Sequence, residues 1–88
     1  MKVLVLYRPN SDHGRKVEEF IENFRSRSSN ERLEALNIDS REGDSMAKLY
    51  DVVSYPAVIV LRSDGSLQKC WQGSELPLID EVQAYARG

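Results

Sequence analysis

The sequence predicts one α/β domain, residues 1–88, in which a four-stranded mixed sheet is flanked by helices. Two uninterrupted apolar runs, residues 3–7 and 57–61, are typical of strands that are covered on both faces. Between them, the apolar residues at positions 17, 20, 21 and 24 follow the spacing of one helix face. Eighty-eight residues can enclose one hydrophobic core but not two. We therefore expect a single domain in which strands and helices alternate.

The first strand and the helix after it are joined by residues that suit turns and helix caps. Residues 2–7 predict the strand, and residues 8–14 contain proline, asparagine, serine, aspartate and glycine. Ser11 or Asp12 is expected to cap the helix, because either side chain can accept a hydrogen bond from a free main-chain N–H of the first turn. The helix is expected to end before a loop at residues 28–30.

The next stretch predicts a second strand and a short second helix. Residues 33–39 have apolar side chains that alternate between two faces, as in a strand. Residues 39–44 predict a polar connection, and residues 45–50 predict a helix capped by Asp44 or Ser45. The apolar side of this helix would consist of Met46, Leu49 and Tyr50.

The last third of the chain predicts a hairpin and a final helix. Residues 57–61 form the second interior strand, and Asp64-Gly65 is typical of a tight turn that reverses the chain. Residues 67–72 alternate apolar and polar side chains up to Gly73, which favours an edge strand. Pro77 suits the start of the last helix. Its apolar stripe would consist of Leu78, Ile79, Val82, Tyr85 and Ala86.

These elements fit one sheet with the strand order 2-1-3-4. The two wholly apolar strands belong at its centre, and the two strands of mixed character belong at its edges. The first strand–helix–strand unit should be right-handed, with parallel strands. The turn at residues 64–65 makes the last two strands antiparallel.

Composition and charge exclude several classes of function. A net charge of −2 and an isoelectric point near 5.3 disfavour nonspecific binding to nucleic acid, which needs a basic surface. The single cysteine, Cys70, and the single histidine, His13, make an internal disulfide or a structural zinc site unexpected. The first apolar run is too short to span a membrane. We therefore expect a cytoplasmic protein that needs no metal or cofactor.

Two stretches of the chain resemble the thioredoxin-like superfamily, in the small form typical of glutaredoxins. Residues 6–14 are similar to the glutaredoxin pattern of a strand, a tyrosine, a basic residue, a proline and Cys-x-x-Cys. Residues 50–60, followed by Asp64-Gly65 and Gly73, are similar to the thioredoxin segment that holds a cis-proline, a hairpin and a glycine beside the active site. The resemblance implies a thioredoxin-like fold with the element order β-α-β-α-β-β-α.

The sequence departs from this family at the residues that carry its chemistry. Ser11-Asp12-His13-Gly14 stands where the family has Cys-x-x-Cys. That chemistry needs a thiolate at the start of a helix, and a serine hydroxyl cannot attack a disulfide. Cys70 belongs to the last strand, away from the helix start, and is no substitute. We therefore expect no thiol–disulfide exchange, and we expect that cysteines introduced at positions 11 and 14 would lie close enough to form a disulfide.

The feature that points most directly to function is Tyr55-Pro56. The resemblance implies a cis peptide bond there, beside a groove in which the main chain of Tyr55 meets an extended peptide or a thiol ligand. The groove would be lined by Arg8, Asn10, Ser11, His13, Tyr55, Pro56 and Gly73. The leading hypothesis is a redox-inactive monomer that binds a protein or peptide. A simpler interpretation makes Ser11 a helix cap and His13 a solvated loop residue, because neighbours in one short loop rarely converge as a catalytic triad does.

Two other hypotheses remain open from the sequence. One is a glutathione- or thiol-dependent enzyme, related to glutaredoxins or glutathione transferases, that uses a residue other than cysteine. Those transferases carry an additional helical domain, which these 88 residues do not contain. The other is a structural or dimerisation domain that pairs through an uncovered edge strand, at residues 32–38 or 67–72. The balance favours binding over catalysis.

Overall fold

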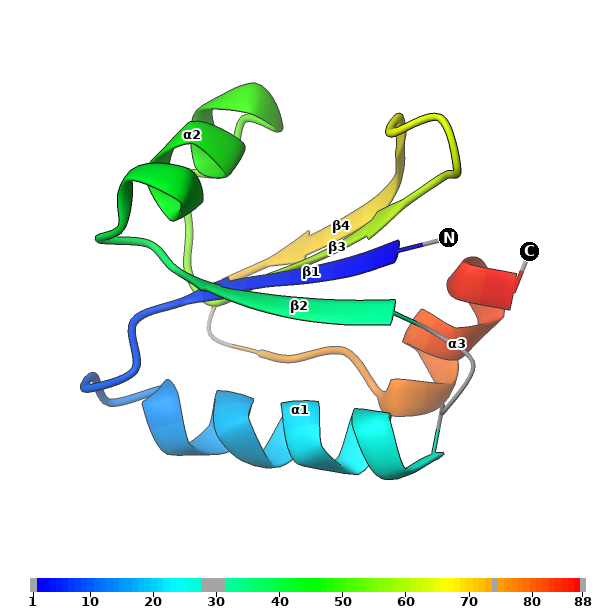
Figure 1. The fold of residues 1–88 in the computed structure, drawn as a ribbon. Helices are drawn as coiled ribbons and strands as arrows, with labels where there is room; N and C mark the ends of the chain where they lie inside the picture. The colour runs from blue at the N-terminus through cyan, green and yellow to red at the C-terminus, as the bar shows by residue number, and fades with distance from the viewer. Residues whose placement is uncertain (1, 28–31, 74, 88) are drawn as a thin grey trace.

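A computed structural model describes residues 2–27, 32–73 and 75–87 of the chain. Its elements follow the predicted order of strands and helices (Figure 1). They are β1 Lys2–Tyr7, α1 Gly14–Arg27, β2 Arg32–Asn37, α2 Arg41–Leu49, β3 Ala57–Leu61, β4 Leu67–Gln72 and α3 Ile79–Arg87. The loop predicted at residues 28–30 lies outside the described residues.

The four strands form one mixed sheet in the order β2-β1-β3-β4, as the sequence predicts. Strand β1 pairs with β2 in parallel and with β3 antiparallel, and β3 pairs antiparallel with β4. The two wholly apolar strands are therefore central. A register shift between Val60 and Leu61 interrupts the β3–β4 ladder beside the hairpin.

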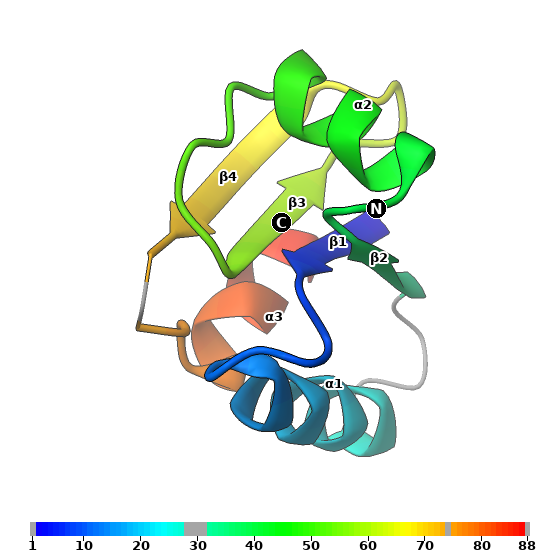
Figure 2. The same ribbon diagram turned by 90° about the vertical axis from the view of Figure 1, so that its left-hand side faces the viewer.

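One face of the sheet is covered by α1 and α3 (Figures 1 and 2). Alternate residues of β1 and β3 point to this face, since side chains along a strand alternate between its two sides. The apolar stripe of α1 packs there, and all four of its predicted residues are buried. The edge of this core is closed by Trp71 of β4, whose ring meets that of Tyr85 in α3 edge-on, with 5.5 Å between centroids.

The opposite face of the sheet is covered by α2 (Figure 1). Here the other residues of β1 and β3, including Leu4, Leu6 and Ile59, pack with Ala47 of α2. Two separate apolar layers on one thin sheet explain why both central strands are apolar without alternation. Among the described residues, no helix is both long and apolar enough to cross a membrane.

The second helix starts earlier than the sequence predicts. It begins at Arg41 rather than Ser45, and Ser40 is its N-cap, because the Ser40 hydroxyl accepts a hydrogen bond of 3.0 Å from the Gly43 N–H. The residues buried in α2 are the small Gly43 and Ala47, which give no conspicuous apolar stripe. Leu49, placed on the apolar side by its spacing, is 66% exposed.

The last helix begins two residues beyond the predicted proline. Leu78 precedes its first turn and is 70% exposed, so it does not belong to the apolar stripe. Its main-chain N–H donates to the carboxylate of Glu81 at 3.1 Å, and its carbonyl accepts from the N–H of Val82 at 3.2 Å. This is the reciprocal half of a capping box, in which a glutamate side chain fixes the residue before the helix.

Candidate functional site

The loop between β1 and α1 is held by hydrogen bonds within itself. The hydroxyl of Ser11 donates to the carbonyl of Arg8 at 2.6 Å, and the Ser11 N–H donates to the same oxygen at 3.3 Å. In return, the main-chain N–H of Arg8 donates to Nε2 of His13 at 3.1 Å. In this bond the imidazole nitrogen accepts from the main chain at the end of β1. His13 therefore fixes the loop rather than lying free in solvent.

The prediction that Ser11 or Asp12 caps α1 is wrong. The helix begins at Gly14, and the carbonyl of His13 accepts the first intrahelical bond, from Val17 at 3.1 Å, so His13 occupies the cap position. Ser11 lies two residues further out, where its hydroxyl donates to a carbonyl instead of accepting from the helix. The Ser11 hydroxyl therefore stabilises a turn within the loop, whereas the sequence predicted that it would cap the helix.

Gly14 lies so close to Pro9 that no side chain fits between them. A β-carbon on Gly14 would overlap the carbonyl oxygen of Pro9 and lie 2.8 Å from its carbonyl carbon. This contact is with main chain, which cannot swing away as a flexible side chain does. The expectation that cysteines at positions 11 and 14 would form a disulfide is therefore wrong for this loop, because position 14 has no room for a β-carbon.

The start of α1 meets the segment before β3. The Tyr55–Pro56 peptide bond is cis. A hollow of about 280 Å³ is lined by His13 and Lys16 from one side and by Tyr55 and Pro56 from the other, with Asp12 at its edge. A neighbouring hollow of about 320 Å³ shares His13, Lys16 and Pro56 and continues past Val17 to residues 75–76. Together these form one groove, which we call the proline groove.

The predicted site residues divide into two groups. His13, Tyr55 and Pro56 line the proline groove, and the N–H of Gly73 donates to the carbonyl of Pro56 at 3.1 Å beside it. Arg8, Asn10 and Ser11 do not line it. Sequence reasoning missed Lys16, which reaches both hollows from the first turn of α1. Its position three residues after His13, on the same helix face, was the available signal.

Arg8 points toward β2 instead of the groove. Its guanidinium makes two hydrogen bonds to the carboxylate of Asp39, from Nε at 2.9 Å and from Nη2 at 3.0 Å. These two bonds raise the pKa of Arg8 and lower the pKa of Asp39. The pair joins the segments that follow β1 and β2, two parallel neighbours, and so ties down the base of the loop.

Cys70 lies in β4, far from the start of α1 in the fold. Its side chain packs with the apolar layer under α2, whereas α1 covers the opposite face of the sheet. Burial raises the pKa of the thiol, although a weak hydrogen bond from Gln72 to the sulfur, at 3.8 Å, acts the other way. The cysteine therefore has neither the place nor the electrostatic surroundings of a helix-terminal thiolate.

This architecture superposes on solved structures of thioredoxins. A thioredoxin 1 from the thermophilic eubacterium Thermosipho africanus superposes with a TM-score of 0.70 over 99% of this chain and 91% of that one, at 17% identity. The chain has a thioredoxin-like fold. Thioredoxin O2 from Arabidopsis thaliana, solved in its oxidised state, gives a TM-score of 0.73 over 98% of this chain and 71% of that one, at 10% identity.

A further solved structure, described as that of a malarial protein, superposes with a TM-score of 0.74 at 14% identity, over 97% of this chain and 91% of the other. No family profile and no curated protein matches the sequence. These superpositions establish the fold alone. Within the described residues, no group of three histidine, cysteine or acidic side chains is arranged to hold a metal ion.

Proposed function

We propose that this thioredoxin-like domain binds an extended peptide segment of a partner protein in the proline groove and carries out no thiol–disulfide exchange. The observation that carries the proposal is the lining of that groove. Side chains from the start of α1 and from Tyr55-Pro56 meet there, as a binding site needs, and none of them contains sulfur. A scaffold that keeps the groove and lacks the nucleophile is suited to binding.

Main-chain groups beside the groove support a peptide as the ligand. Within the described residues, neither the N–H nor the C=O of Tyr55 has a hydrogen-bond partner. An extended peptide can satisfy both groups, since its own main chain offers one donor and one acceptor per residue. The adjacent Val53 is 84% exposed and is held through its N–H by the side chain of Gln72 at 2.9 Å. It offers an exposed apolar side chain two residues before Tyr55.

The chemistry of the loop supports the absence of redox activity. A serine hydroxyl at position 11 does not supply the thiolate that attacks a disulfide. Gly14 admits no side chain, so a second sulfur has no place one helical turn later. Cys70 lies under α2 with a raised pKa.

Two assays test the redox part of the proposal. The domain should neither accelerate the reduction of insulin by dithiothreitol nor reduce hydroxyethyl disulfide with glutathione. The Cys70→Ser variant should behave as the parent does. Turnover that survives in Cys70→Ser would contradict the proposal, because the sequence contains no other thiol.

Selection from a random peptide-display library, followed by titration of the selected peptides, tests the binding part. We expect chemical-shift changes at residues 13, 16 and 53–56. Lys16→Trp should block the groove and weaken binding by about tenfold or more, since a bulky side chain would fill a hollow of about 280 Å³. Arg15→Trp is the matched control, because Arg15 is also exposed in the same turn but lines neither hollow.

Reduced glutathione provides the contrasting titration. Shifts at Ser11 and Tyr55 with glutathione, and none with selected peptides, would favour the thiol-dependent enzyme over the peptide-binding domain. Peptides whose binding is equally weakened by both tryptophan variants, or by neither, would show that the proline groove is not their site.

A further inference from the structure

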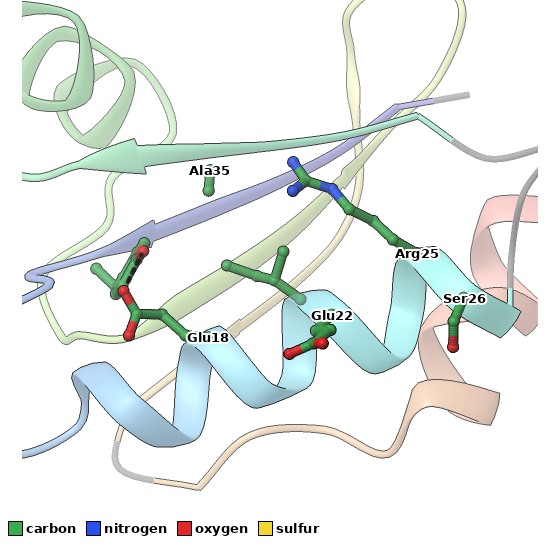
Figure 3. A pocket seen from close by; sticks show the side chains of 7 residues that line it. Glu18, Glu22, Arg25, Ser26 and Ala35 are labelled. Atoms are coloured by element: carbon green, nitrogen blue, oxygen red, sulfur yellow. Dashed lines mark hydrogen bonds between the residues drawn. The ribbon is translucent and has the colours of Figure 1, made fainter.

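A second, larger hollow lies between α1 and the edge strand β2 (Figure 3). Its volume is about 520 Å³, within the range of roughly 300–1,000 Å³ typical of small-molecule sites. It shares no lining residue with the proline groove. The residues that line it are Tyr7, Glu18, Ile21, Glu22, Arg25, Ser26 and Ala35. We call it the α1–β2 hollow.

The floor of the α1–β2 hollow is apolar and belongs to the core. Tyr7 and Ile21 are buried, and Ala35 of β2 packs against the same layer. These side chains are fixed by the sheet and by the inner face of α1, so the floor is preformed. A hydrocarbon or aromatic body lying on it would be removed from water on one side, which favours binding.

The rim of the hollow carries two carboxylates that form no ion pair within the part of the chain that the structure describes. Glu18 and Glu22 stand one turn apart on α1, a spacing at which like charges repel. None of the four ion pairs among the described residues includes either of them. Glu18 accepts a hydrogen bond from the hydroxyl of Tyr7 at 3.3 Å, which brings its carboxylate in over the floor (Figure 3).

The third charged group at the hollow is Arg25, which is oriented toward the strand. Its side chain reaches from α1 to β2 (Figure 3), and its Nη2 donates to the carbonyl of Leu33 at 3.4 Å. It forms no ion pair with Glu18 or Glu22 in the described part of the chain. The rim therefore has a net negative charge, with its one cation at the β2 side.

We propose that the α1–β2 hollow binds a small organic cation with an apolar body, whose ammonium group lies between Glu18 and Glu22 and whose body lies on Tyr7, Ile21 and Ala35. Each part of such a ligand meets a complementary part of the hollow. The ammonium relieves the repulsion between the two carboxylates, and the apolar body lies against the apolar floor. A bare metal ion would leave that floor uncovered.

Phenethylamine is a suitable probe, and 2-phenylethanol and phenylacetate are controls of the same shape that are neutral and anionic. We expect the methyl signals of Ile21 and Ala35 to shift with the amine, with a dissociation constant on the order of 1 mM for so small a ligand. The two controls should bind at least about fivefold more weakly. Equal binding of amine and alcohol would overturn the proposal, since no charge would then be recognised.

Neutralising a charge should change the affinity for the amine in opposite directions on the two sides of the hollow. Glu22→Gln should weaken amine binding about three- to fivefold, as for one partly screened charge contact, and Arg25→Gln should strengthen it by a similar factor. Glu19→Gln is the matched control, because Glu19 lies on the same helix but outside this hollow. Weaker amine binding to Arg25→Gln would refute the cation site, because removing a positive charge should favour an ammonium group, and an unchanged affinity in Glu22→Gln would equally refute it. Each variant's folding is checked by its amide spectrum before titration.

Discussion

Gly14 packs directly against the carbonyl of Pro9, and a β-carbon at position 14 would overlap that oxygen. The connection between β2 and α2 repeats this arrangement, since a β-carbon on Gly43 would overlap the carbonyl oxygen of Asn37. In both loops a serine three residues before the glycine donates its hydroxyl to a carbonyl at 2.6 Å. A Ser-x-x-Gly sequence thus brings a glycine against a main-chain carbonyl at the entry of two helices, although Ser40 caps α2 and Ser11 does not cap α1.

Replacing either glycine with alanine should therefore destabilise the domain. Gly14→Ala places a methyl group against fixed main chain, and relief requires the loop or the helix to move, at a cost of about 3 kcal/mol. Urea unfolding measures the change in the free energy of unfolding. Gly43→Ala should lower the free energy of unfolding by a similar amount. Arg15→Ala, on the exposed face of α1, should change the free energy of unfolding by less than about 0.5 kcal/mol. A loss below about 1 kcal/mol in both glycine variants would contradict the close approach.

The bidentate contact between Arg8 and Asp39 predicts a dependence of stability on pH. The hydrogen bonds from Arg8 hold the pKa of Asp39 below its usual value of 3.8. In the unfolded chain the carboxyl titrates at that usual value, so the contact's stabilisation is fully present above about pH 4 and is lost as the pH falls through the lower, folded-state pKa. We therefore expect the stability difference between the parent and Asp39→Asn to be largest at neutral pH and to shrink below pH 4.

The measurement is the urea midpoint of both proteins between pH 2 and pH 7. Glu42→Gln, which neutralises an exposed carboxylate in the first turn of α2, is the control for general charge effects. A difference between parent and Asp39→Asn that stays constant across this range would show that the Arg8–Asp39 contact does not form in solution.

Sequence patterns predicted the sheet because its two central strands are covered on both sides. The continuous apolar runs in β1 and β3 report that burial directly, and the Asp64-Gly65 turn fixes the direction of β4. The start of α2 was missed because the residues that it buries are small. Gly43 and Ala47 approach the sheet closely and give no apolar periodicity, so the polar residues around them suggested a loop.

The sequence predicted only some residues of the candidate site. Tyr55 and Pro56 were found through a resemblance, and His13 through its place in the loop, but the direction of a loop side chain depends on hydrogen bonds that spacing does not reveal. Ser11 turned back to the Arg8 carbonyl, and Arg8 turned to Asp39. The α1–β2 hollow was missed entirely, because Ala35 and the pair of Glu18 and Glu22 meet only once β2 is placed beside α1.

The position of Cys70 predicts a thiol that reacts slowly. Burial raises its pKa, so less thiolate is present near neutral pH than for an ordinary cysteine, and the sulfur is partly covered by the layer under α2. The reaction with 5,5′-dithiobis(2-nitrobenzoate) at pH 8 should be at least about tenfold slower in the folded domain than in urea. Leu67→Cys in the Cys70→Ser background gives the comparison within the same strand, because Leu67 is 41% exposed. If Cys70 reacted as fast in the folded domain as in urea, β4 would have to open readily or the thiol would have to lie outside the core. Either result would contradict the partly covered position of Cys70 under α2.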